Sequence, residues 1–249
     1  MPPCVWIYTG GLHSHGEDLV HNHTAQNLLI DADDTLWENN IYYERVIQEA
    51  VTLLDGASVD SCAFRTVLDE AELLRIPLQG YGTLNFTQSL VETFRMFQPA
   101  DADPSLSERV QKLSLAILDH PLEIIETVPE TLAYLSSRHA LHLVTKGNQE
   151  EQSRKVRDSN LRSFFRSVEI LPEKDSLAFS RLLDQYCWER SCTWMIGNSP
   201  RSDINPALAV GMNAVYIPHM HTWTFEQEHP MDHPKLMMLA RFSDLRLHF

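Results

Sequence analysis

The sequence lacks any run of about 18 uninterrupted apolar residues, which is the length that a membrane helix needs. Its first residues also lack the basic segment of a secretory signal. Both absences predict a cytoplasmic protein without a membrane partner. Cysteines are few: the 249 residues contain 4, with no CxxC pair and no Cys/His finger spacing. This usage excludes a disulfide scaffold and predicts free thiols.

Basic residues are scarce as well. Lys and Arg number 20 against 34 Asp and Glu, which gives a formal net charge of −14. No broad electropositive surface is therefore available for nucleic-acid phosphates or anionic lipid. Hydrophobic residues make up 43% of the chain, as in ordinary globular proteins, and the length predicts one large domain or a core with a smaller insert.

The amino-terminal residues 1–24 differ from the rest of the chain. They carry His13, His15, His21 and His23 among glycine and polar residues, and no apolar period continues through them. A small metal site is one interpretation, but nothing in the sequence orients these side chains. We therefore predict a flexible terminal extension.

Short apolar segments alternate with helix-like segments in the second half of the sequence. Together with one early segment they predict an α/β fold, a Rossmann-like parallel sheet with helices on both faces. The predicted strands are NLLI (27–30), LHLVT (141–145), SVEIL (167–171), TWMIG (193–197) and NAVYIP (213–218).

Between the first two strands the sequence has helical periodicity. Apolar residues share a face in three stretches, for example Phe86, Leu90 and Phe94, and breaks are predicted at Asp55-Gly56, at Pro77 with Gly80-Tyr81-Gly82, and at Pro99 to Pro104. This predicts an inserted all-α domain. The predicted division is a core of residues 25–37 and 121–249 and a helical insert of residues 38–120.

Polar residues follow three of the predicted strands. Asp31 and Asp33 come after the first, Thr145 ends the second, and Asp203 lies in the loop after TWMIG, while Lys174 supplies a positive charge. Ligands bind at the carboxyl ends of strands in such sheets. Carboxylates two residues apart on an extended strand point the same way, so one can attack phosphorus while the other handles protons. Oxygen ligands from Asp31 and Asp203 suit Mg²⁺.

The segments LLIDADDTL, LVTKGN, EKD and IGNSPRSDI occur in the order and spacing of the haloacid dehalogenase-like (HAD) hydrolase superfamily. The chain resembles this family from Asn27 to about Pro218. The helical insert has the position of the family's C1 cap, which closes over the active site and selects the substrate.

The resemblance implies a mechanism. Asp31 corresponds to the nucleophile that forms an aspartyl-phosphate, and Asp33 to the acid and base that protonates the leaving oxygen and then activates water. Thr145, Lys146 and Lys174 correspond to the residues that bind and neutralise the phosphoryl group.

The same resemblance implies a Mg²⁺ site on Asp31, the carbonyl of Asp33, Asn198 and Asp203. The family's fourth motif commonly reads GDSxxxD, whereas this sequence has GNSPRSD, with Asn198 in place of a carboxylate. The amide still offers an oxygen but removes one negative charge. We expect weaker Mg²⁺ binding, not its loss.

Two regions outside these motifs are candidates for the rim of the site. Tyr81, between Gly80 and Gly82, and Asn85 suit a substrate-contacting loop of the cap, although turn and packing roles explain them equally well. His219 and His221 have no third metal ligand at regular spacing, which favours a loop near the rim.

The leading hypothesis is a Mg²⁺-dependent phosphatase that acts on a small phosphorylated metabolite. Asp33 argues against a 2-haloacid dehalogenase, which in this family lacks that carboxylate, whereas a phosphomutase stays open. A phospho-receiver and a degenerate binding module are the non-enzymatic alternatives. The sequence names neither the substrate nor the oligomeric state.

Overall fold

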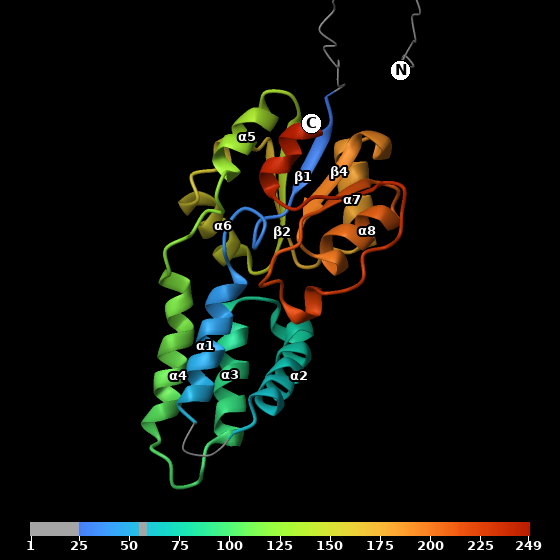
Figure 1. Ribbon diagram of the computed structural model, residues 1–249. Coiled ribbons are helices and arrows are strands. Elements are labelled where there is room, and N and C mark those ends of the chain that lie inside the picture. The colour runs from blue at the N-terminus through green and yellow to red at the C-terminus, as the bar shows by residue number, and fades with distance from the viewer. Residues whose placement is uncertain (1–24, 55–58) are drawn as a thin grey trace, which may run out of the picture.

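The computed structural model describes residues 25–54 and 59–249 (Figure 1). The predicted extension of residues 1–24 lies outside the described residues. Within them the chain forms a six-stranded sheet in which all neighbouring strands are parallel, in the order β3-β2-β1-β4-β5-β6. The strands are β1 (Asn27–Ile30), β2 (Ala140–Lys146), β3 (Ser167–Leu171), β4 (Thr193–Gly197), β5 (Asn213–Tyr216) and β6 (Leu236–Met238). The five predicted strands are confirmed, and β6 is an addition at the sheet edge.

Helices cover both faces of the sheet (Figure 1). Alternate residues of a strand point to opposite faces, so Leu28 and Ile30 of β1 join one hydrophobic core and Leu29 joins another. The first core is closed by α5 (Val128–Ser136), α6 (Gln149–Asp158) and the carboxyl-terminal turn η7 (Phe242–Leu247); the second is closed by α7 (Ser176–Tyr186) and α8 (Asn205–Ala209). The continuous apolar character of β1 follows from burial on both faces.

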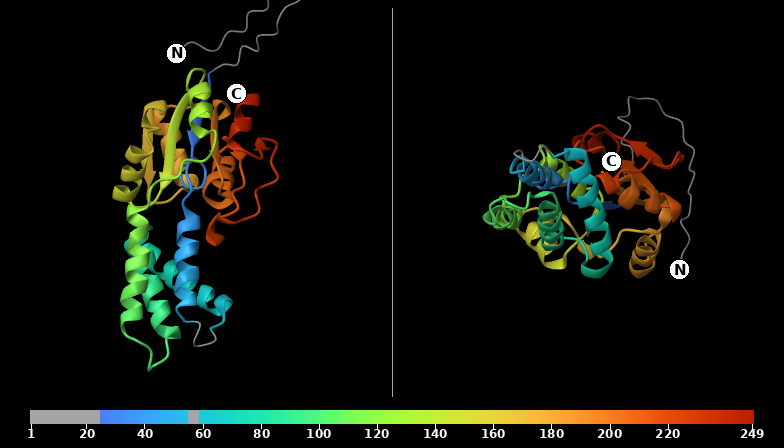
Figure 2. Two further views of the ribbon diagram at one scale, coloured as in Figure 1. Left: turned by 60° about the vertical axis from the view of Figure 1, so that its left-hand side comes forward. Right: turned by 90° about the horizontal axis from the view of Figure 1, so that it is seen from below.

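Four helices follow β1 and form a separate layer beyond the carboxyl ends of the strands (Figures 1 and 2). They are α1 (Asn40–Thr52), α2 (Ser61–Gln79), α3 (Thr83–Phe97) and α4 (Ser105–Leu115). Their predicted apolar faces meet in a core of their own that includes Phe64, Leu90, Phe94 and Val110. We call α1–α4 the cap, because they form a helical insertion at the C1 position.

The break predicted at Pro77 with Gly80-Tyr81-Gly82 falls at its glycine end. Helix α2 does not break at Pro77 but continues to Gln79, and Gly80, with φ 75°, ends it. Proline lacks the backbone N–H and clashes with the carbonyl four residues earlier, so a break was the expectation. The chain stops the helix where glycine takes up a left-handed conformation instead.

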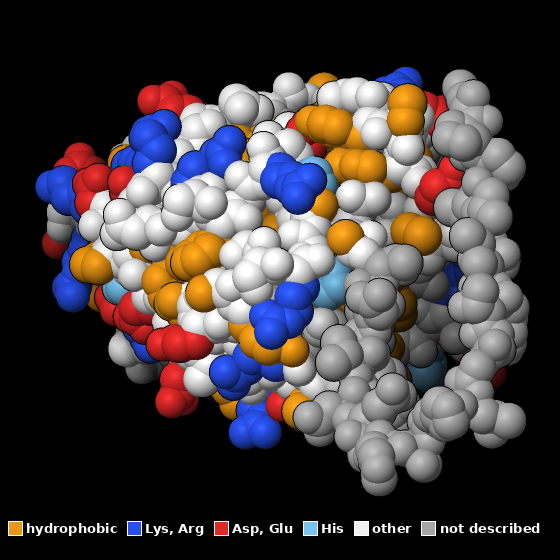
Figure 3. All heavy atoms as spheres, turned by 90° about the horizontal axis from the view of Figure 1, so that it is seen from above, with side chains coloured by type: hydrophobic (Ala, Val, Ile, Leu, Met, Phe, Trp, Pro, Cys, Tyr) orange, Lys and Arg blue, Asp and Glu red, His pale blue; other side chains and the backbone are white. Residues whose placement is uncertain are grey.

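The end of the core opposite the cap is seen in Figure 3. On its coloured part, lysine and arginine side chains alternate with acidic ones, and hydrophobic side chains form small groups. No helix among the described residues is long and apolar enough to cross a membrane.

Candidate active site

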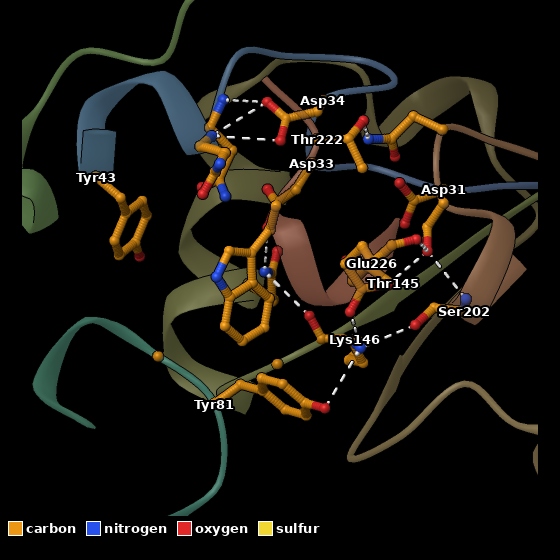
Figure 4. A pocket seen from close by; sticks show the side chains of 18 of the residues that line it. Asp31, Asp33, Asp34, Tyr43, Tyr81, Thr145, Lys146, Ser202, Thr222 and Glu226 are labelled. Carbon is orange, nitrogen blue, oxygen red and sulfur yellow. Dashed lines mark hydrogen bonds and ion pairs between the residues drawn. The ribbon is translucent and has the colours of Figure 1, made fainter. Parts of the chain in front are cut away.

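A cavity lies where the carboxyl ends of β1, β2 and β4 face the cap (Figure 4). The loops after these strands supply its floor, and helices α1, α2 and α3 supply its roof. The predicted residues at this edge of the sheet all line it, namely Asp31, Asp33, Thr145, Lys146, Lys174, Asn198 and Asp203. The parallel sheet thus brings together motifs that lie far apart in the sequence.

Asp31 is fixed at the end of β1. Its backbone N–H donates to the carbonyl of Ile196 on β4 at 2.9 Å, which continues the sheet ladder by one residue. Its carboxylate accepts from Lys174 Nζ at 2.5 Å and from the Thr35 hydroxyl at 3.1 Å. Burial raises the pKa of Asp31, and the Lys174 ammonium opposes this only in part. A cation beside this carboxylate is therefore favourable.

Lys174 joins two buried carboxylates. Its Nζ also donates to Asp203 Oδ1 at 2.5 Å, while Asp203 Oδ2 accepts the backbone N–H of Ser199 at 3.0 Å. Burial lowers the pKa of Lys174, but Asp203 and Asp31 outweigh this, and the net pKa is raised. For Asp203 burial is the larger effect, and its pKa lies well above the ordinary value. Lys174, the lysine of the EKD segment, is thus a fixed positive charge between two acids.

Gly197 leaves space for Asp203. A Cβ at this position would lie 2.2 Å from Asp203 Oδ2 and 2.5 Å from its Cγ. Such contacts are far inside van der Waals distance. The glycine that ends β4 is therefore required by close packing against the carboxylate.

Asp33 has a different environment from Asp31. Its carboxylate accepts from Trp37 Nε1 at 2.6 Å, from Gln152 Nε2 at 2.7 Å and from Lys155 Nζ at 2.9 Å. Burial by itself raises the pKa of Asp33, but the Lys155 ammonium and these hydrogen bonds outweigh it and lower the pKa. Asp33 is therefore held as a carboxylate.

Gln152 and Lys155 were not predicted from the sequence as residues of the site. They lie on α6, which begins directly after the LVTKGN motif, and their spacing of three residues places them on one helix face. That spacing was the only sequence signal, and it did not reveal Asp33 as the partner, which is 122 residues away from Lys155.

Thr145 and Lys146 end β2 at the cavity. Thr145 is 1% exposed. Lys146 Nζ donates to Ser202 at 2.9 Å and to Glu226 Oε1 at 2.5 Å. Glu226 belongs to the loop after β5, and Trp223 of the same loop also lines the cavity. Neither residue was predicted from the sequence. Burial raises the pKa of Glu226, but Lys146 outweighs it and the net pKa is lowered.

Tyr81 lines the cavity from the cap side and lies beside Lys146 (Figure 4). Its hydroxyl donates to Glu173 at 2.7 Å, and the Lys146 ammonium stands 4.4 Å from its ring centroid. Asn85 is placed differently. Its amide donates to the carbonyl of Gly80, it is buried, and it is not among the residues of the cavity wall. Asn85 therefore stabilises the turn before α3, and the substrate contact expected for it is corrected.

Asn198 is buried close to Asp31. Its amide oxygen accepts from the Thr35 hydroxyl at 3.3 Å, and its amide nitrogen donates to the Thr222 hydroxyl at 2.9 Å. The hydroxyl of Thr35 thus bridges the oxygens of Asn198 and Asp31. Together with Asp203, these residues form a set of buried oxygen atoms of the kind that Mg²⁺ prefers.

His219 lies beside two acids, with Nε2 3.3 Å from Glu38 and Nδ1 3.7 Å from Asp34. Ligand atoms of the three lie within 4.8 Å of one another. Asp34, however, already accepts the backbone N–H groups of Asn39 and Asn40, which caps the first turn of α1. The cluster therefore has a structural role at the base of the cap.

A parallel sheet with a helical insertion and a group of buried acids at its carboxyl edge defines a capped α/β enzyme. The family model of the haloacid dehalogenase-like hydrolases matches residues 26–211 of the sequence. The chain belongs to this family. No curated protein matches the sequence.

Solved structures of the family resemble the chain over most of its length. A haloacid dehalogenase-like family hydrolase from Xanthomonas campestris is 29% identical, with 90% of both chains covered and a TM-score of 0.79. The HAD hydrolase YfnB from Bacillus subtilis, bound to magnesium, is 16% identical, with 91% of this chain and 99% of that chain covered and a TM-score of 0.61. The L-2-haloacid dehalogenase from Xanthobacter autotrophicus, with chloropropionic acid covalently bound, is 12% identical, with coverages of 90% and 98% and a TM-score of 0.58. The last two show the fold alone.

Proposed function

We propose that this hydrolase is a Mg²⁺-dependent phosphatase that acts on a small phosphorylated metabolite through an aspartyl-phosphate. The observation that carries the proposal is the buried set of Asp31, Lys174 and Asp203, with Asp33 two residues beyond the nucleophile. A phosphatase needs a carboxylate nucleophile, a cation against it and a second carboxylate for protons.

In the proposed reaction an oxygen of Asp31 attacks the phosphorus of the substrate and the ester oxygen leaves. Thr145 and the backbone N–H group of Lys146 bind the phosphoryl oxygens, whereas the N–H group of Gly147 already donates to the carbonyl of Leu171 at 3.1 Å. The ammonium of Lys174 offsets the charge that gathers on the nucleophile and the phosphoryl group.

Asp33 handles the protons. Its pairing with Lys155 favours the ionised form, which suits the base that activates water for hydrolysis of the aspartyl-phosphate. The acid role in the first half-reaction needs a proton on the same carboxylate, and the Lys155 contact opposes that state. We therefore propose that Asp33 acts mainly as a base. Its main task is then to activate the water that hydrolyses the aspartyl-phosphate.

The oxygen donors fit a magnesium ion. Asp31 and Asp203 are buried carboxylates with raised pKa, and a divalent cation stabilises their ionised forms. With the amide oxygen of Asn198 and the carbonyl of Asp33, they would hold the ion. When bound, Mg²⁺ supplies positive charge that orients and polarises the phosphoryl group.

Two observations oppose dehalogenation. Asp33 occupies a position where the dehalogenases of this family have no carboxylate. Arg65 lines the cavity, but its charge is already paired with two acids: Glu44 accepts from its Nη1 at 2.7 and 2.8 Å, and Asp69 accepts from its Nε at 2.8 Å.

The test is hydrolysis of an aryl phosphate by the wild type, Asp31→Asn and Asp158→Asn, with Mg²⁺ and with EDTA. Asp158 is an exposed acid at the end of α6 and serves as the matched control. We expect hydrolysis by the wild type and the control, and its loss with EDTA or in Asp31→Asn. Release of halide from 2-chloropropionate without phosphate hydrolysis overturns the proposal in favour of a dehalogenase.

A further inference from the structure

The cap end of the cavity differs chemically from its core end. Tyr43 and Ile47 of α1 and Phe86 of α3 supply apolar walls there, with the rings of Tyr43 and Phe86 edge to face at 4.8 Å. Between these walls the cavity is lined by Glu44, Arg65 and Glu72.

Glu72 has no hydrogen bond and no ion pair with any residue that the structure describes. Its pKa is raised to about 8, chiefly by burial, with Asp69 and Glu44 adding to the effect and Arg65 opposing it. Glu72 is only partly exposed, and a partly buried carboxylate without a partner is costly to the fold. Such a group on a cavity wall points to a ligand that supplies the partner.

Arg65 does not fill that role. Its guanidinium is held by Glu44 from α1 and by Asp69 from one turn farther along α2. These two acids already exceed its single positive charge. Glu44, Asp69 and Arg65 sum to −1 while Glu72 is protonated, and its ionisation takes the sum to −2. A cation at the cap end therefore favours the ionised form of Glu72.

We propose that the substrate of this phosphatase carries a protonated primary amine that binds the carboxylate of Glu72, while its phosphoryl group lies at Asp31 and Lys174. The inference rests on the proposed function and names the substrate class for the same site. An aminoalkyl phosphate or an amino-sugar phosphate has this chemistry.

An ammonium fits better than a hydroxyl for two reasons. It brings the positive charge that the cap end lacks, and its three N–H donors match carboxylate oxygens. The rings of Tyr43 and Phe86 also offer faces that attract a cation. A neutral alcohol supplies a donor but leaves the charge uncompensated.

The first test compares substrates that differ only by this group: O-phosphoethanolamine against 2-hydroxyethyl phosphate, and glucosamine 6-phosphate against glucose 6-phosphate. We expect the wild type to have the higher kcat/KM for the amine of at least one pair. Glu72→Gln should lower that amine-to-hydroxyl ratio by about tenfold, mainly through KM. The ratio is internal to each variant, so a general loss of activity cancels.

Glu70→Gln is the matched control, because Glu70 is an exposed acid on the same helix. It should leave the ratio unchanged. A wild type that prefers the hydroxyl compound in both pairs, or a ratio that Glu72→Gln does not change, overturns the inference. Aryl phosphate hydrolysis in the same preparation then shows that the phosphatase itself stands.

The second test does not depend on turnover. Asp31→Asn, alone and combined with Glu72→Gln, is titrated calorimetrically with O-phosphoethanolamine at pH 7 in buffers of different ionisation enthalpy. The raised pKa of Glu72 favours the protonated form at pH 7, and the ammonium contact favours the ionised form. We therefore expect binding to release a proton to the buffer, and Glu72→Gln to abolish this release. Binding without proton release, or no difference between the variants, overturns the inference.

Discussion

The two ends of the cavity satisfy their charges in different ways. At the core end each lysine that lines the cavity contacts a carboxylate: Lys174 with Asp31 and Asp203, Lys155 with Asp33, and Lys146 with Glu226. At the cap end Glu72 is left without a partner among the described residues. At the core end each of these lysines is therefore paired before a substrate binds, whereas at the cap end Glu72 is not.

The difference follows from how the two ends are built. At the core end the sheet ladder fixes Asp31 at the end of β1. Asp203 lies in the turn after β4, where its N–H donates to the Ser199 carbonyl and its Oδ2 accepts the Ser199 N–H. The cap end is formed by side chains on helices that pack through a separate core. Chemistry common to many substrates can be assigned to the first, and choice of substrate to the second.

The largest effect is expected from Gly197→Ala, which disrupts the core end. The new Cβ would overlap the Asp203 carboxylate and displace it from Lys174. We expect kcat to fall roughly 100-fold or more for every substrate alike, because misplaced groups lose near-attack geometry.

Gly211→Ala is the control for this prediction. Unlike Gly197, Gly211 has a left-handed φ, 84°, and a Cβ there meets only Arg190 at 3.6 Å. Steady-state kinetics and thermal unfolding of both variants separate the local effect from general destabilisation. Equal losses of activity in the two variants would contradict the explanation.

A smaller effect is expected at the junction of the two ends. Gly82 has φ 132°, and a Cβ would lie 2.9 Å from Glu151, whose carboxylate accepts the backbone N–H and the hydroxyl of Thr83. Gly82→Ala should therefore weaken the contact between α3 and α6 by ~1–3 kcal/mol and raise KM more than it lowers kcat.

Gly80→Ala separates strain from contact. Gly80 has φ 75° with nothing within 4 Å of the added Cβ, so this variant adds backbone strain without the overlap with the core. Kinetics of both variants with an aryl phosphate give the comparison. The prediction is wrong if Gly80→Ala raises KM as much as Gly82→Ala.

The smallest effect concerns the charge of the core end alone. Asn198→Asp keeps the size of the side chain and adds a negative charge beside Asp31 and Asp203. We expect the half-saturating Mg²⁺ concentration to fall roughly three- to tenfold, because the added carboxylate attracts the cation. Titration of activity with Mg²⁺ measures this, with Asn160→Asp as an exposed charge control. An unchanged midpoint in Asn198→Asp refutes it.

Much of the fold was readable from the sequence. Strands β1, β3 and β4 have the predicted bounds, since each is a short apolar run that ends at a turn or a glycine. The apolar period of α3 also identified its buried face. The break predicted at Pro77 with Gly80-Tyr81-Gly82 falls at the glycines, because α2 accommodates Pro77 and ends at Gly80.

The residues of the candidate site also differ in how well the sequence predicts them. Asp31, Thr145 and Asp203 were found because they lie at or after the ends of predicted strands, and strand ends of a parallel sheet share one edge. Lys174 was found as a positive charge in the family's third motif. Asn85 was misplaced, because its proximity to Tyr81 in the sequence does not say which side chain faces the cavity.

The sequence by itself determined which chemical groups the protein has and the order in which strands present them, because these depend on local apolar runs and neighbouring turn residues. Only the tertiary structure decided the partners: Lys155 for Asp33, Glu226 for Lys146, and, among the described residues, no hydrogen-bond or ion-pair partner for Glu72. These contacts join helices and loops that lie far apart in the chain, and only the packing of those elements sets the distances between the side chains.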